Sequence, residues 1–334
     1  MDDPDMFFKD FRNWAGLPWD VLSEIFDKVG VVCLISSVQS VCQQWWKLAH
    51  ESQIYRHVHI DDNQFYDNEE DPKSFSTVNL DYIALASIDR SAGCLKELSI
   101  QYVGFPKFIF QRASERSTQL KVLNIGDEVD FKEHDLLEAC KRFPLLEVLH
   151  TYSYRTLSSV AIESIGHSCP NLKDFAFNSE GHDFEGKCNI IAFAIAKNMP
   201  GLKKLEMIRD PLGDDGLIAI LDGCPQLEIL HIDYCFNLMI KEKLKYRLSK
   251  IEVKYLKSSS GKYVDLDDEY AEMLGSRDYD EVDNHDEVDD IGDGDYDYDF
   301  HDDDYDYDYD YDYDDDDDFD ELMKMLVISA IIGD

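Results

Sequence analysis

The sequence predicts an α/β protein in three parts: a short N-terminal helical unit, a solenoid of about six strand–helix repeats, and an acidic tail without regular structure. Three observations support this prediction. Apolar residues recur at helical spacing in residues 17–49, a Leu-x-x-Leu motif recurs six times in 95–232 with Phe175 in place of the second leucine in one copy, and Asp/Tyr-rich sequence dominates after residue 258. With 334 residues the chain has room for two domains. The expected divisions are a leader (1–12), the helical unit (13–60), a linker (61–79), the repeats (80–257) and the tail (258–334).

The helical unit is strongly apolar for its length. Pro18 suits a first helical turn, where its missing N–H would be unpaired in any case. A wide apolar stripe follows, and Gly30 is predicted to end that helix. The first stripe is Val21, Leu22, Ile25, Phe26 and Val29, and the second is Leu34, Ile35, Val38, Val41, Cys42 and Trp45. Three short helices cannot bury this surface among themselves, so either the rest of the chain or another protein must cover it.

The repeat begins with a Leu-x-x-Leu segment that reads as a short strand. Its first leucines are Leu95, Leu120, Leu146, Leu172, Leu202 and Leu227, which are 25, 26, 26, 30 and 25 residues apart. This period is typical of leucine-rich repeats, whose stacked units bury a continuous core and present their strands on a concave side. Helical patterns lie between the strands, at 80–88, 136–140, 160–165, 191–196 and 217–221. Residues 58–60 and 251–253 are predicted to add a first and a last strand.

Side chains between the inward-facing leucines should project from the strand face in three rows, which begin at Glu97, Ser99 and Gln101. The rows mix polar and aromatic residues, a composition that partner proteins use. We expect contact with a partner protein on this face, and the alternative is a solvated face without a specific ligand. The candidate contact residues are His150, Tyr152, Asp174, Ile208, His231 and Asp233.

The net charge of −39 is concentrated in the tail. Residues 265–321 contain 31 acidic residues and one basic residue, Arg277, which gives −30. This sign disfavours binding to nucleic-acid phosphates. Neighbouring carboxylates repel one another and nothing covers the tyrosines, so the tail is predicted to be disordered. Three roles are open for it: keeping the chain soluble, binding a basic partner, or weak condensation of calcium. The apolar segment 322–332 is compatible with a fold-back helix or with an exposed tail.

Several function classes lack their sequence signatures. The eight cysteines form no Cys-x-x-Cys pair and no zinc-type spacing with histidine, so we expect buried free thiols in a reducing compartment. The N-terminal residues lack the apolar core of a signal peptide, and no run reaches the roughly 18 apolar residues of a membrane span. The expected location is the nucleus, the cytoplasm or both, away from membranes. We find no nucleophile motif, phosphate loop or paired carboxylates outside the tail, and therefore predict no enzyme, metal or cofactor.

Residues 13–60 resemble an F-box. The residues that match this motif are Leu17-Pro18, Ile25-Phe26, Leu34, Val38, Val41-Cys42, Trp45-Trp46 and Ile54-Tyr55. Cys-Pro-x-Leu turns at Cys169 and Cys224 extend the likeness, so that residues 13–257 resemble the F-box/LRR proteins and most closely their short plant members. Gln43-Gln44 departs from the family where a basic residue is common, and Tyr55 departs where a tryptophan is common.

This resemblance implies a non-catalytic substrate receptor of an SCF-type (cullin-RING) E3 ubiquitin ligase. The F-box would bind a Skp-family adaptor, and through it cullin and RING subunits, while the repeats hold the substrate. By position, the adaptor contacts would be drawn from Leu17, Pro18, Leu22, Ile25, Leu34, Val38, Val41 and Trp45, some of which must instead form the internal core. The alternative is a non-ligase scaffold of leucine-rich repeats whose acidic tail binds basic partners.

Overall fold

The computed structural model describes residues 16–61, 79–153, 157–179, 189–233, 235 and 237–256, all of which belong to one compact unit. The side chains of residues 233, 242–243 and 253–256 are not described. The predicted leader and the tail, including the segment 322–332, lie outside the described residues. Within the described part of the chain, no helix combines the length and the apolarity that crossing a membrane requires.

Residues 19–56 of the N-terminal helical unit form two α-helices and two short 3-10 turns. They are α1 (Trp19–Ser36), η3 (Val38–Ser40), α2 (Gln43–Leu48) and η4 (Ser52–Arg56). Gly30 breaks α1 with φ 79° and ψ 158°, a backbone conformation that glycine adopts without a steric penalty. The predicted break at Gly30 is therefore confirmed, but the chain resumes a helix at once. The second apolar stripe does not form one helix, because it is divided among the end of α1, η3 and α2.

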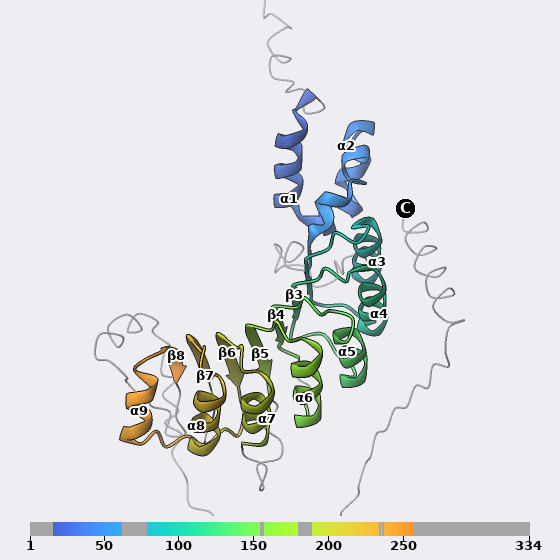
Figure 1. Ribbon diagram of the computed structural model, residues 1–334. Helices are drawn as coiled ribbons and strands as arrows, with labels where there is room; N and C mark the ends of the chain where they lie inside the picture. Colours follow the sequence, from blue (N-terminus) through green and yellow to red (C-terminus); the bar gives the residue numbers. More distant parts are fainter. Residues whose placement is uncertain are drawn as a thin grey trace, which may run out of the picture. The chain divides into compact units, whose positions relative to one another are not determined.

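The repeats form one sheet of eight parallel strands in sequence order (Figure 1). The strands are β1 (His57–Ile60), β2 (Glu97–Ile100), β3 (Val122–Ile125), β4 (Val148–Thr151), β5 (Asp174–Asn178), β6 (Lys204–Ile208), β7 (Ile229–Asp233) and β8 (Glu252–Leu256). Each of the six predicted repeats supplies one strand, and the predicted first and last strands are present as β1 and β8. The one long repeat interval contains residues 180–188, which lie outside the described residues.

One helix follows each strand up to β7, and in Figure 1 these helices lie on one side of the sheet. They are α3 (Leu80–Arg90), α4 (Pro106–Arg116), α5 (Glu133–Cys140), α6 (Ser159–Ser168), α7 (Ile190–Asn198), α8 (Asp214–Gly223) and α9 (Glu242–Leu248). The five predicted helical segments are confirmed within α3, α5, α6, α7 and α8. Helices α4 and α9 were not predicted from the sequence; both carry several charged residues, Lys107, Arg112, Glu115 and Arg116 in α4 and Glu242, Lys243, Lys245 and Arg247 in α9.

The core lies between the sheet and the helices. Strand residues alternate between buried and half-buried positions, so that Leu98 and Ile100 of β2 are fully buried while Glu97 and Ser99 are not. The cysteines at the repeat turns complete this core. Cys140, Cys169 and Cys224 are buried free thiols, as predicted, whereas Cys33, Cys42 and Cys94 are only half-buried. Burial raises the pKa of Cys224 to about 11. The buried thiols are therefore packing residues with little nucleophilic character.

Candidate functional site

The strand face opposite the helices carries the predicted rows of side chains, and we call it the open face. Strand register aligns Glu97 with Val122, Val148, Asp174, Lys204 and Ile229, and it aligns Ser99 with Asn124, His150, Ala176, Glu206 and His231. Two positions of β5, Ala176 and Asn178, are buried, whereas Asp174 is half-buried like its neighbours in its row. The open face is therefore continuous in register, and its paired polar groups lie on β4, β5, β6 and β7.

His150, Asp174 and Lys204 form a chain of polar contacts across β4, β5 and β6. His150 Nε2 lies 3.0 Å from one carboxylate oxygen of Asp174, and Lys204 Nζ lies 3.2 Å from the other. Burial by itself would raise the pKa of Asp174. The hydrogen bond from His150 and the charge of Lys204 outweigh it, so the pKa lies below its ordinary value. Asp174 is therefore held as a carboxylate between two donors.

A second set of contacts lies beside the first. Glu206 Oε2 accepts a hydrogen bond from Tyr152 Oη at 3.4 Å and lies 3.3 Å from His231 Nδ1. The rings of His150 and Tyr152 meet edge to face with centroids 5.8 Å apart, which joins the two sets. Burial raises the pKa of Tyr152, and the negative charges of Glu206 and Asp174 raise it further, so the phenol remains protonated. We call these six residues, from His150 to His231, the strand network.

The structure brings together four of the six residues that the sequence analysis proposed for substrate contact. His150, Tyr152, Asp174 and His231 all belong to the strand network. Ile208 is half-buried at the end of β6, in register with Asp233, whose side chain is not described. Lys204 and Glu206 were not among the residues predicted for this contact, although both stand in the predicted rows. A sequence feature that could have indicated Lys204 is its position next to Asp174, a residue of opposite charge, in the same row.

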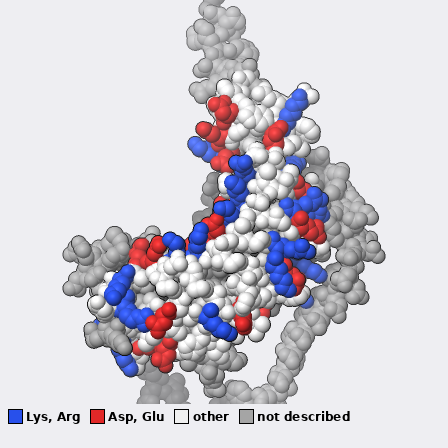
Figure 2. Space-filling model, in the orientation of Figure 1, with Lys and Arg blue, Asp and Glu red and all other residues white. Residues whose placement is uncertain are grey.

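Charged residues also line the starts of the strands, one position after each first leucine. Lys121 and Lys173 both lie 2.7 Å from Glu147, and Lys203 lies 2.9 Å from Glu228. The two lysines lower the pKa of Glu147 to about 2. Figure 2 shows Lys and Arg interspersed with Asp and Glu along the sheet. These pairs lie near the surface, and each contributes little to stability.

The chemistry available at the strand network is non-covalent recognition. Its side chains offer a held carboxylate, an aromatic ring and imidazole groups, which suit hydrogen bonds and charge pairing with a protein. Among the described residues, no group of three or more His, Cys, Asp and Glu side chains is arranged to hold a metal ion.

The proposed adaptor contacts differ widely in exposure. Leu22 and Leu34 are fully buried, so we assign these two to the core of the helical unit instead of to an adaptor surface. Val41 is 61% exposed and Pro18 is also exposed. The others are half-buried: Leu17, Ile25, Val38 and Trp45. Trp45 leans toward the core, since its ring meets that of Phe26 at 5.6 Å.

Three exposed apolar residues of the helical unit were not among the proposed contacts. Trp19 is 50% exposed, Val21 is 39% exposed and Trp46 is 51% exposed. Val21 lies three residues after Pro18 and four before Ile25, so these residues share one side of α1. That spacing was present in the sequence, but it could not show that Val21 faces outward while Leu22 faces inward. We call Pro18, Trp19, Val21, Val41 and Trp46 the exposed apolar set.

The parallel strand–helix repeats define this chain as a leucine-rich-repeat protein with a helical unit before its first strand. No family model matches the chain. Among the curated relatives are two Arabidopsis thaliana proteins with the provisional names F-box/LRR-repeat protein 23 and 9. The first is 34% identical over 72% of this chain and 52% of its own length, and the second is 31% identical over 69% and 91%. A third, F-box protein SKIP19 of the same plant, is 27% identical over 81% of this chain and 85% of its own length. The chain thus spans about half the length of the first relative and most of the second.

The chain belongs to the F-box/LRR-repeat family. The order of the structure, a helical unit followed by parallel strand–helix repeats, agrees with the order of the two parts in this family name, and we call the helical unit the F-box.

Proposed function

We propose that this protein is the substrate-recognition subunit of an SCF-type (cullin-RING) ubiquitin ligase. Its F-box binds a Skp-family adaptor, which connects it to the cullin and RING subunits, and its open face holds the protein to be ubiquitinated. The observation that carries the proposal is the exposed apolar set in a chain that belongs to the F-box/LRR-repeat family. The sheet and helices of the repeats bury their own core, but the described residues leave these apolar side chains uncovered.

The exposed apolar set has the chemistry of a protein contact. Tryptophan is enriched among the residues that dominate binding energy, and Trp19 and Trp46 each expose half of their surface. Burial of apolar surface contributes roughly 25 cal/mol per Å², so two indoles and two valines supply a substantial contact. Pro18, Val21 and Ile25 on one side of α1 would lie against a helix of the adaptor, in the manner of other helix-mediated recognition.

The strand network supports the second half of the proposal. Its charged groups are already paired and oriented in the free chain, so a substrate that uses them finds them pre-organised. The receptor performs no chemistry in this scheme. It accelerates ubiquitin transfer by holding a substrate lysine near the charged conjugating enzyme, which raises the effective concentration of the reactants.

Co-purification with a Skp-family adaptor tests the proposal. The wild-type chain should retain the adaptor, and Val41→Asp should reduce this retention by about tenfold or more, because a carboxylate would be buried in an apolar contact. Val160→Asp is the matched control, since Val160 of α6 is 71% exposed and lies outside the helical unit. Both variants replace an exposed valine, so both should keep the circular dichroism of the wild type.

Two results would contradict the proposal: no retention of the adaptor by the wild-type chain, or equal retention by Val41→Asp and Val160→Asp. Either result would favour the alternative, a non-ligase scaffold of leucine-rich repeats whose acidic tail binds basic partners. The observation behind this alternative is the charge of −30 in residues 265–321, where 31 acidic residues accompany Arg277.

A further inference from the structure

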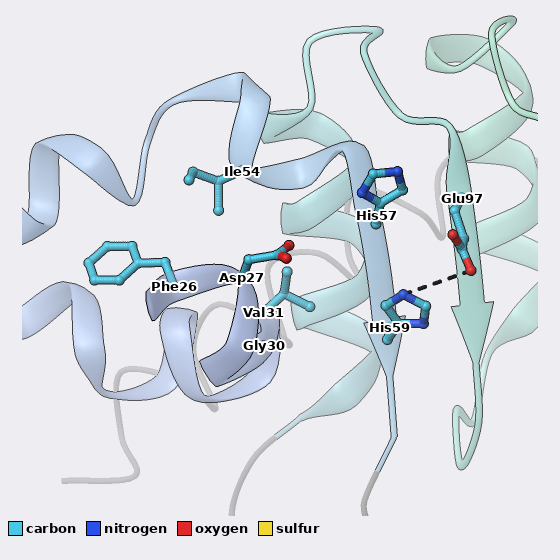
Figure 3. Close-up of a pocket in the computed structure, with 8 residues that line it drawn as sticks. All are labelled: Phe26, Asp27, Gly30, Val31, Ile54, His57, His59 and Glu97. Carbon is cyan, nitrogen blue, oxygen red and sulfur yellow. Dashed lines mark ion pairs between the residues drawn. The ribbon is translucent and has the colours of Figure 1, made fainter. Parts of the chain in front are cut away.

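A cavity of about 330 Å³ lies where the F-box meets the first two strands of the repeats (Figure 3). Its lining residues come from four elements. They are Phe26, Asp27, Gly30 and Val31 of α1, Ile54 of η4, His57 and His59 of β1, and Glu97 of β2. This volume is at the lower end of the range of ligand sites, so the cavity fits a single side chain or a small molecule.

One part of the cavity is apolar and the other carries ionisable groups. Phe26 and Val31 are almost fully buried, and half-buried Ile54 lies beside them. Figure 3 shows the carboxylate of Asp27 extending from α1 toward His57, and Glu97 extending from β2 over His59. A ligand would therefore meet methyl groups and an aromatic ring along its length and two carboxylates at its head.

The two carboxylates lack strong internal partners. Glu97 lies 3.8 Å from His59 Nε2, which is longer than a hydrogen bond. Among the described residues, no Lys, Arg or His lies in salt-bridge range of Asp27, and neither Arg56 nor Lys96 is part of the lining. An anion would be repelled by both carboxylates, and a wholly apolar ligand would desolvate them without compensation. The complementary ligand is a cation on an apolar stem.

The cavity is continuous with the open face. Register places His57 beside Glu97, and the same row runs through Val122 and Val148 to Asp174 of the strand network. A protein segment that crosses the open face along this row therefore reaches the cavity at the F-box end. We propose that this cavity binds a lysine or arginine side chain of the protein that lies along the open face. That the bound protein is a ubiquitination substrate rests on the proposed function, but the cation site itself does not.

The test uses two short peptides that differ in one charge. The probes are acetyl-Gly-Ser-Arg-Ser-Gly-amide and the same peptide with citrulline, a neutral isostere, in place of arginine. Histidine C–H signals of the full chain report binding by NMR, with the His57 and His59 signals assigned from His57→Gln and His59→Gln. The arginine peptide should shift both signals in a saturable way, and the citrulline peptide should bind about tenfold more weakly or worse. A lysine peptide should behave as the arginine peptide does.

The doubly neutralised variant Asp27→Asn/Glu97→Gln provides the second measurement. It should weaken arginine-peptide binding by about tenfold or more and remove the preference over citrulline. Glu163→Gln/Asp222→Asn is the matched control, because it neutralises two carboxylates on α6 and α8 that lie outside the cavity. Equal binding of the arginine and citrulline peptides, or unchanged binding by Asp27→Asn/Glu97→Gln, would overturn the inference.

Failure of this inference and failure of the proposed function give different results. If the wild-type chain retains the adaptor but shows no charge-dependent peptide binding, the cation site is wrong and the receptor role stands. If the peptide binds with the expected preference but the adaptor is not retained, the cation site stands and the receptor role is wrong. Asp27→Asn/Glu97→Gln should retain the adaptor as the wild type does, because neither residue belongs to the exposed apolar set.

Discussion

Arg90 donates a hydrogen bond to the hydroxyl of Tyr55 at 3.0 Å and thereby joins the repeats to the F-box. Arg90 stands in the last turn of α3, whereas Tyr55 is fully buried in η4. The same guanidinium nitrogen contacts Gln39 Oε1 at 3.1 Å, and the Tyr55 hydroxyl donates to the carbonyl of Ala49 at 2.6 Å. Burial raises the pKa of Tyr55, and Arg90 opposes this shift only in part. Tyr55, which stands where a tryptophan is common in F-boxes, therefore forms a polar connection between the helical unit and the repeats.

Arg90→Ala should lower the free energy of unfolding by about 2–3 kcal/mol, because a buried hydroxyl and the Gln39 amide lose a charged donor. Tyr55→Phe should lower it by about 1 kcal/mol. The double variant should be less destabilised than the sum of the two, since both changes remove the same hydrogen bond. Urea unfolding of the full chain measures all three.

Arg116→Ala is the matched control for this cycle. Arg116 is 55% exposed and its ion pair with Asp89 is long, at 3.9 Å, so its loss should change stability by less than about 0.5 kcal/mol. Strict additivity of Arg90→Ala and Tyr55→Phe would show that the hydrogen bond does not couple the F-box to the repeats.

The repeat architecture could be predicted because two features of the sequence indicate each strand. One is the regular spacing of the leucines along the chain, and the other is the alternation of apolar and polar residues within each copy. The leucines at 95, 120, 146, 172, 202 and 227 keep a spacing near 25 residues, and alternation then fixes which side chains project. Helices α4 and α9 were not predicted, because their packing against neighbouring helices needs only a few apolar residues. In α4 the buried residues are Pro106, Ile109, Phe110 and Ala113.

For the candidate sites, the sequence could predict which residues share a surface but not which side chains contact one another. The rows placed His150, Tyr152, Asp174 and His231 on one face, but spacing along the chain does not say which side chains turn toward one another. The F-box had a similar limit. Leu22 and Val21 both belong to an apolar stripe, and only the elements packed against α1 decide that Leu22 is buried and Val21 exposed. The cavity between α1 and β1 arises from segments that meet only in three dimensions.

Gly223 at the end of α8 permits close packing against α7. A Cβ at this position would clash with the backbone of Ala196, where the Cα and the carbonyl carbon would both lie 2.7 Å away. Gly223→Ala should therefore reduce the free energy of unfolding by about 1–3 kcal/mol, because one helix must shift. The midpoint of thermal or urea unfolding measures the loss.

Gly201→Ala is the comparison for Gly223→Ala, because it adds the same methyl group in an open position. The nearest atom to its Cβ would be the carbonyl oxygen of Leu172 at 3.7 Å, an ordinary contact. Its stability should stay within about 0.5 kcal/mol of the wild type. If the two variants unfold at the same midpoint, close packing of α7 and α8 at Gly223 is not a determinant of stability.

Asp210, which follows β6, is 2% exposed and accepts a hydrogen bond from Ser179 Oγ at 3.2 Å. Burial raises its pKa from 3.8 to about 6, and the hydrogen bond from Ser179 opposes this only in part. Between these two values the folded chain binds more protons at this site than the unfolded chain does. The free energy of unfolding therefore falls as pH rises through this window, by up to about 3 kcal/mol from this carboxyl.

Asp210→Asn should abolish this dependence, because its amide oxygen can accept the Ser179 hydrogen bond without ionising. Urea unfolding at pH 4 and pH 8 should show the variant gaining stability over the wild type as pH rises, by up to about 3 kcal/mol. Asp222→Asn is the control, because it removes a carboxylate whose side chain is 66% exposed. The difference in unfolding free energy between this variant and the wild type should change far less between pH 4 and pH 8. Parallel pH profiles for Asp210→Asn and the wild type would contradict the prediction, because they would mean that this carboxyl titrates alike in the folded and unfolded chains.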